Sequence, residues 1–168
     1  VVVRVRTAPA VRGYTGVIFP DYAAGLAALR ELEQSRIAPD VTRLSDPQET
    51  AVTLAMSGPS GRSADLLDKC LAMRKVSEPC LAIFGWEGTR SSVSARRLEA
   101  LPVLRRNGGV SLSSKVGNAW EHGRFDGPFL RDVLIDEGYL VETLETATHW
   151  SNMEHLRDAV RGALTESL

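Results

Sequence analysis

Residues 120–132 read WEHGRFDGPFLRD, and residues 145–150 read ETATHW. The first stretch places aromatic side chains, a histidine and two arginines around glycine and proline, which break helices. A helix that only packs into a core does not need that mixture. The pattern predicts one helix over residues 115–123 and a second over residues 128–136, because proline is favoured in the first turn of a helix. Glu137-Gly138 ends the second helix.

Outward from this stretch, strand-like and helix-like segments alternate. Valine alternates with arginine over residues 1–7, which predicts a half-buried strand. Further strands are predicted from their composition at residues 14–19, 41–44, 80–86, 110–112 and 139–145. Further helices are predicted from apolar spacing at residues 21–35, after a loop at residues 57–61, at residues 90–106 and from residue 151 onward.

Several local signals set the ends of these elements. Asp46-Pro47 is interpreted as a turn, and Pro102 is expected to kink or split the basic helix around it. Asn107-Gly108-Gly109 ends that helix by a glycine C-cap. Ser151 and Glu154 have the spacing of a capping box, which predicts Ser151 as the N-cap of the last helix.

The order of these elements predicts an α+β fold. Short strands that alternate with helices over short connections favour a ferredoxin-like α/β sandwich, with helices covering one face of an antiparallel sheet. A Rossmann domain is the alternative. The chain, however, lacks a G-x-G-x-x-G sequence after a strand and also lacks a Walker A motif.

Composition narrows the class of protein. A chain of 168 residues is long enough for one domain with its own core. The formal net charge of −1 gives no basic surface of the kind that nucleic acid requires. No apolar run approaches the roughly 20 residues of a membrane helix. Together these features predict a cytoplasmic globular protein.

The thiols and histidines give no sign of a metal site. Cys70 and Cys80 match neither a redox motif nor a zinc motif, so both are expected to be reduced and to carry no role. The histidines at positions 122, 149 and 155 lack metal-ligand spacing with a carboxylate. We therefore expect no metal.

Two arginines are candidates for binding an anion. Arg131 lies at the start of a predicted helix, where a guanidinium fork and the helix dipole both favour an anion. A plain ion pair with Asp132 is the alternative. Arg43 lies on a short strand next to a turn, where an arginine is more often a surface residue.

Other side chains in and near residues 120–132 each have more than one possible role. His122 is a candidate general base or a solvated histidine at a helix end. Trp120 and Phe125 are candidates for a flat pocket, with core packing as the alternative. Glu145 is a candidate partner that orients Arg131 or Arg124.

The pattern W…RF…P-aromatic-LRD…ET…W resembles the substrate domain of FAD-linked oxidases of the vanillyl-alcohol-oxidase type. It looks most like the alkyldihydroxyacetonephosphate synthase branch of that family. Residues 39–46 are similar to the family's P-x-x-x-R-L-x-D. The resemblance implies that Arg43 and Arg131 bind the phosphate of the substrate.

The same resemblance implies a larger protein. In that family an N-terminal FAD-binding domain precedes the substrate or cap domain, and a histidine loop follows later in the cap. Neither the flavin loop nor the S-H-H-H-G motif is in this sequence. Residues 1–168 are therefore expected to be a partial cap domain, with FAD bound mainly by the missing domain. The implied partners are the FAD-binding domain of the same protein and an anionic small molecule. A homodimer and a peripheral membrane contact stay open.

Three functions are compatible with the sequence. The first is an ether-forming exchange on an acyl-dihydroxyacetone phosphate, without net redox change. The second is a FAD-dependent dehydrogenase or oxidase of a 2-hydroxy acid, with the same arginines on a carboxylate. The third is of another class, a stand-alone ferredoxin-like binding or oligomerisation module.

Overall fold

The computed structural model describes residues 2–5, 7–57, 69, 71–74, 76–112 and 114–167. The chain divides into two compact units, Val1–Arg124 and Phe125–Leu168. Of the loop predicted at residues 57–61, residues 58–61 lie outside the described residues, as does most of the helix predicted after it, including Cys70.

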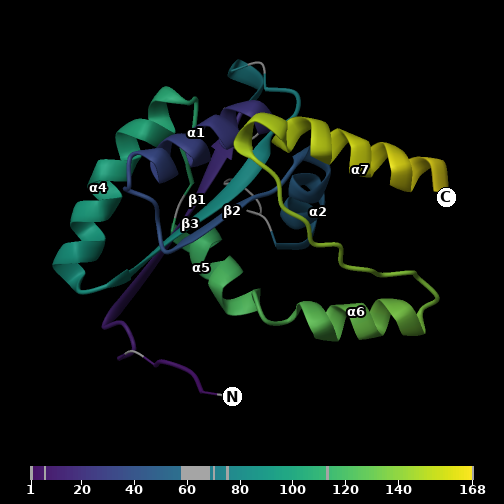
Figure 1. Ribbon diagram of the computed structural model, residues 1–168, viewed down its shortest axis with the longest axis horizontal. Coiled ribbons are helices and arrows are strands. Elements are labelled where there is room, and N and C mark those ends of the chain that lie inside the picture. The colour runs from purple at the N-terminus through teal and green to yellow at the C-terminus, as the bar shows by residue number, and fades with distance from the viewer. Residues whose placement is uncertain are drawn as a thin grey trace. The chain divides into compact units, whose positions relative to one another are not determined.

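The first unit is built on a four-stranded antiparallel sheet with the strand order β2-β3-β1-β4 (Figure 1). The long central pair runs in register from Val11 opposite Gly88 to Phe19 opposite Cys80. With one helix after β1 and another after β3, this is the ferredoxin-like β-α-β-β-α-β arrangement, which confirms the predicted fold class. The strands are β1 (Val11–Phe19), β2 (Val41–Leu44), β3 (Cys80–Gly88) and β4 (Val110–Ser111).

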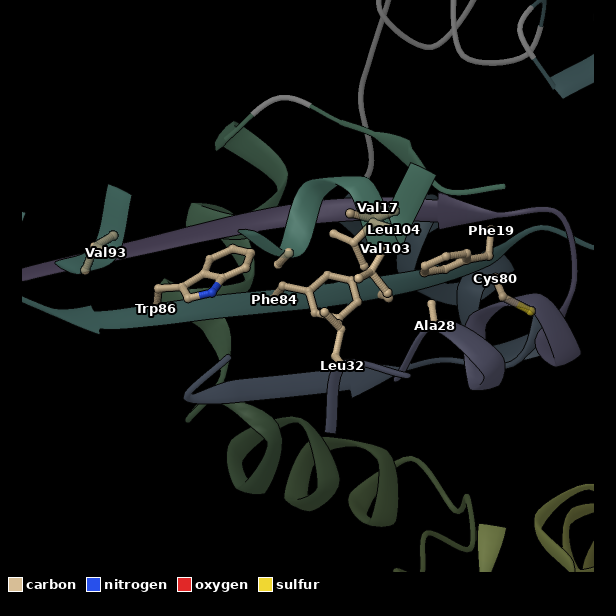
Figure 2. Packing of buried hydrophobic residues seen from close by; sticks show 12 residues of the cluster. Val17, Phe19, Ala28, Leu32, Cys80, Phe84, Trp86, Val93, Val103 and Leu104 are labelled. Atoms are coloured by element: carbon tan, nitrogen blue, oxygen red, sulfur yellow. The ribbon is translucent and has the colours of Figure 1, made fainter. Parts of the chain in front are cut away.

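Helices α1 (Tyr22–Gln34) and α4 (Arg90–Arg106) cover one face of the sheet. Their buried side chains, such as Leu32 and Leu104, pack against every second residue of β1 and β3 (Figure 2). The rings of Phe19, Phe84 and Trp86 form a chain of aromatic contacts in this layer. We call it the α1/α4 face.

Helix α5 (Ser114–Gly123) covers the opposite face of the sheet. A Cβ atom on Gly117 would lie 2.4 Å from the carbonyl carbon of Tyr14, so the helix backbone rests directly on β1. Tyr14 and Ile18 of β1, with Leu81 and Ile83 of β3, are buried on this side. We call it the α5 face. The helices therefore cover both faces and not the single face predicted: β1 is buried without interruption from Tyr14 to Phe19, and β3 from Cys80 to Trp86, as expected of strands covered on both sides.

Some predicted elements differ from the structure. The described residues within 1–7, and residues 139–145, are irregular and not strands, so alternation was misleading where no neighbouring strand is available. Pro102 lies inside α4 without ending it. Asp46-Pro47 begins helix α2 (Pro47–Ser57), which the sequence reading treated as a turn.

The second unit is helical. Helix α6 (Gly127–Asp136) begins one residue before the predicted position, and α7 (Met153–Ser167) follows a 3₁₀ turn, η1 (Trp150–Asn152). Ser151 lies inside that turn, so it is not the N-cap of α7 as predicted. Among the described residues no helix is both long and apolar enough to cross a membrane.

Candidate functional site

The register of the sheet places Arg43 on the α5 face. Arg43 pairs with Ile83, and Val41 pairs with Gly85. Side chains of directly paired residues point to the same side of a sheet. Ile83 belongs to the buried cluster of the α5 face, so Arg43 lies on that side as well, with 47% of its side chain exposed.

Glu49 forms an ion pair with Arg43 from the first turn of α2. Its Oε1 accepts from Nη2 of Arg43. The backbone N–H of Glu49 donates to Oδ1 of Asp46 at 2.9 Å, so Asp46 caps the helix. Arg43 is thus held at the end of β2 by a carboxylate on a capped helix.

Thr50 ties this helix to the sheet. Its side chain is fully buried, and its Oγ1 accepts from the backbone N–H of Leu81 at 2.8 Å. The N–H of Ser45 donates to the carbonyl of Leu81 at 2.8 Å. These bonds fix the first turn of α2 against β3, and with it the position of Glu49.

The second group of polar residues lies at the end of α5, where Arg124 meets Tyr14. The Nη1 of Arg124 donates to the hydroxyl of Tyr14 at 2.8 Å. Its guanidinium lies 5.7 Å from the ring centre of Tyr14 and 5.9 Å from that of Trp120. The two rings are 5.8 Å apart. Arg124 and Trp120, both singled out from the sequence, therefore converge on a tyrosine that sequence reasoning did not select.

Glu87 completes this network. The Tyr14 hydroxyl donates to Oε1 of Glu87 at 3.1 Å, and Nε of Arg12 lies 3.6 Å from the same oxygen. Burial, followed by the hydrogen bond to Glu87, raises the pKa of Tyr14 above its ordinary value. The phenol therefore stays protonated. It accepts a hydrogen bond from Arg124 and donates one to Glu87.

His122 takes no part in either group. Its Nδ1 lies 2.7 Å from the carbonyl of Asn118 within α5, and the residue is exposed. This arrangement matches the solvated histidine at a helix end, which was the alternative to a general base.

The other candidates belong to the second unit. Arg131 is exposed, and its Nε lies 3.8 Å from Oδ1 of Asp132, the alternative named for it from the sequence. Glu145 is exposed on an irregular segment, and among the described residues of the second unit no ion pair joins it to Arg131. Phe125 is 71% exposed. Their predicted roles in binding stay predictions.

Sequence reasoning missed Tyr14, Glu87 and Glu49. Nothing in a single strand shows which residues lie opposite, so Tyr14 and Glu87 could not be paired. Glu49 did leave a signal: Asp46, Pro47 and Glu49 have the order of an N-cap, a first-turn proline and a third-position acid.

The ring of Trp120 has the core packing that was the alternative to a flat pocket, and the pocket role of Trp120 and Phe125 stays a prediction. This ring is packed against Tyr14 and Arg124, so it serves the core of the α5 face. Among the described residues no cluster of three His, Cys, Asp or Glu could hold a metal ion.

Comparison with known proteins places this geometry in a family. The model of the FAD linked oxidases, C-terminal domain, matches residues 8–168. The alkyldihydroxyacetonephosphate synthase of Dictyostelium discoideum is 29% identical over 162 residues, which are 92% of this chain and 26% of that protein. The synthase of Trypanosoma brucei brucei is 28% identical over 172 residues, which are 98% of this chain and 28% of that protein.

Solved structures agree with this result. An alkyldihydroxyacetonephosphate synthase structure superimposes with a TM-score of 0.81 at 26% identity, over 96% of this chain and 32% of that one. A second superimposes with a TM-score of 0.65 at 30% identity, over 77% of this chain and 24% of that one. The chain thus spans about a quarter of the curated synthases it matches, 26% and 28% of their lengths. It belongs to the family of FAD linked oxidase C-terminal domains.

Proposed function

We propose that this chain is the substrate-binding domain of a FAD-dependent enzyme that works like an alkyldihydroxyacetonephosphate synthase. The enzyme would carry out an ether-forming exchange on an acyl-dihydroxyacetone phosphate. The observation that carries the proposal is the likeness to two synthases over 92% and 98% of this chain. It favours this reading over a stand-alone ferredoxin-like module.

Arg43 is the residue that we assign to the anionic group of the substrate. It is a half-exposed guanidinium at the end of β2, held in place by Glu49 on a capped helix. A positioned guanidinium fork suits phosphate or carboxylate oxygens. We propose Arg131 as a second anion contact, from the second unit.

The flavin would be held by the rest of the enzyme. Bound FAD would supply the electron sink for the exchange. Within this chain, the residues bind and orient the substrate: Arg43 contacts the anion, while Arg124, Tyr14 and Trp120 fix the end of α5 on the sheet.

A 2-hydroxy-acid dehydrogenase or oxidase is the second candidate. One observation favours keeping it: Glu49 already offsets the charge of Arg43. A guanidinium with a carboxylate partner suits a singly charged carboxylate better than a doubly charged phosphate.

An anaerobic titration of flavin absorbance in the full-length protein separates the two functions. Bleaching by acyl-dihydroxyacetone phosphate alone supports the exchange, whereas bleaching by a 2-hydroxy acid alone supports the dehydrogenase. A full-length protein that carries no flavin would overturn both.

Replacement of Arg43 tests the site itself. We expect Arg43→Lys to raise KM for the anionic substrate about tenfold or more, because a two-pronged donor becomes a point charge. Steady-state kinetics of the full-length enzyme measure this change. An unchanged kcat/KM would mean that Arg43 is a surface residue without a role in substrate binding.

The proposed partners are the protein's own FAD-binding domain and an anionic small molecule, in a cytoplasmic location. Cell fractionation tests the location, and light scattering of the full-length protein tests for a homodimer. Sedimentation with lipid vesicles tests for a peripheral membrane contact.

A further inference from the structure

We propose that Glu49 is a specificity-determining residue that sets how much negative charge Arg43 accepts on a bound anion. The inference rests on the proposed role of Arg43. Glu49 would position the guanidinium and at the same time repel anions in proportion to their charge.

The position of Glu49 is fixed by the backbone around it. Asp46 caps α2 through the N–H of Glu49, and the N–H of Thr50 donates to the carbonyl of Asp46 at 2.8 Å. Thr50 is in turn hydrogen-bonded to Leu81 of β3. The backbone of Glu49 is therefore fixed, which keeps its carboxylate within reach of Arg43.

Stability alone is a weak reason for this pair. The side chains of Arg43 and Glu49 are 47% and 43% exposed. Exposed ion pairs make a small contribution to folding because solvent screens them. Glu49 also suits the positive end of the α2 dipole, an interaction that is lost when glutamine removes the charge.

The pair leaves Arg43 able to take another ligand. Glu49 accepts from Nη2, and in the part of the chain that the structure describes Arg43 has no second hydrogen-bond partner. An anion on the remaining donors would lie a few ångströms from the Glu49 carboxylate. Coulomb repulsion scales with the product of the charges, so a dianion is disfavoured about twice as strongly, in free energy, as a monoanion.

The test compares two anions of different charge on the full-length enzyme. Inorganic phosphate at pH 8 is mainly a dianion, and acetate is a monoanion. Their inhibition constants against the substrate, and their direct binding by calorimetry, are measured for the wild type and for Glu49→Gln. Glutamine keeps an oxygen acceptor for Arg43 and removes the charge.

We expect Glu49→Gln to tighten acetate binding about threefold and phosphate binding about tenfold, since repulsion at near-aqueous dielectric is worth about that per unit charge. The gain should vanish when Arg43→Ala is added to Glu49→Gln. Glu33→Gln is the matched control. Glu33 is exposed on α1, on the other side of the sheet, and this substitution also removes one negative charge. It should leave both constants unchanged.

Equal gains for the two anions, no gain, or a gain that survives Arg43→Ala would each overturn the inference. Glu49→Asp keeps the charge and should keep the wild-type preference; loss of the preference in this variant would also contradict it. If Arg43→Lys leaves substrate binding unchanged, the proposed role of Arg43 fails, and a full-length protein without flavin would overturn the proposed function itself. If Arg43→Lys weakens binding and Glu49→Gln changes nothing, only the role of Glu49 fails.

Discussion

The two faces of the central sheet are built from the same strands and differ in what covers them. On the α1/α4 face, large apolar side chains from β1 and β3 interdigitate with two helices, as Phe84 and Leu104 show. On the α5 face, the helix approaches through Gly117, and a network of Tyr14, Arg124 and Glu87 replaces part of the apolar packing. The first face supplies most of the core, and the second face carries the hydrogen-bonded network of Tyr14, Arg124 and Glu87.

The largest effect should come from the α1/α4 face. Phe84 is fully buried and touches the rings of Phe19 and Trp86. We expect Phe84→Ala to lower the free energy of unfolding by about 3–5 kcal/mol, because the cavity cannot collapse among rigid rings. Urea denaturation measures this loss. Leu98→Ala on the exposed side of α4 is the control and should be nearly neutral.

A substitution at Gly117 tests whether the α5 face depends on close approach. A Cβ there would meet the backbone of Tyr14 and Thr15 at 2.4–2.7 Å, so α5 must move. We expect Gly117→Ala to cost about 3 kcal/mol. Gly13→Ala is the matched control on the other face, since its Cβ would lie 3.5 Å from Val93. Similar stabilities for the two variants would contradict the idea that the α5 face depends on close approach and the α1/α4 face does not.

Removal of the Tyr14 hydroxyl tests the polar network with a smaller expected effect. Tyr14→Phe leaves Arg124 and Glu87 without their shared partner, and we expect a cost of about 1–3 kcal/mol. Because the pKa of Tyr14 is raised on folding, the unfolded chain releases the phenol proton first. Stability should therefore fall as the pH rises past 10.0, the ordinary tyrosine value.

Denaturation curves at pH 8 and pH 10.5 check this behaviour. The loss of stability between the two values should be smaller in Tyr14→Phe than in the wild type. An equal loss in both proteins would mean that another group titrates there.

Much of the first unit could be predicted because local patterns and tertiary contacts agree. Residues 41–44 and 90–106 were predicted with the bounds that the structure shows. Strand β1 was predicted three residues short, since Val11–Gly13 give little apolar signal. The position of α5 on the second face could not be predicted, because it depends on Gly117 meeting the backbone of a strand about a hundred residues earlier.

The failures share one physical cause. Valine and arginine alternate at the start of the chain, yet alternation yields a strand only where a neighbour supplies hydrogen bonds. Asp46-Pro47 is as typical of a helix start as of a turn, and only Thr50 bonding to Leu81 decides for the helix. For the site, the sequence selected Arg43, Arg124 and Trp120, but their partners come from other strands and helices.

The close packing of α5 against β1 limits which sequence changes this domain can accept in evolution. Gly16 tolerates no Cβ beneath Val116, where the atoms would lie 2.8 Å apart, whereas its neighbour Val17 fills the α1/α4 face. Loss or gain of one residue in β1 would exchange those two environments along the whole strand. A single substitution on β1 disturbs one position, whereas an insertion or deletion there disturbs every position beyond it, so length variation among relatives should fall in the connections and spare this strand.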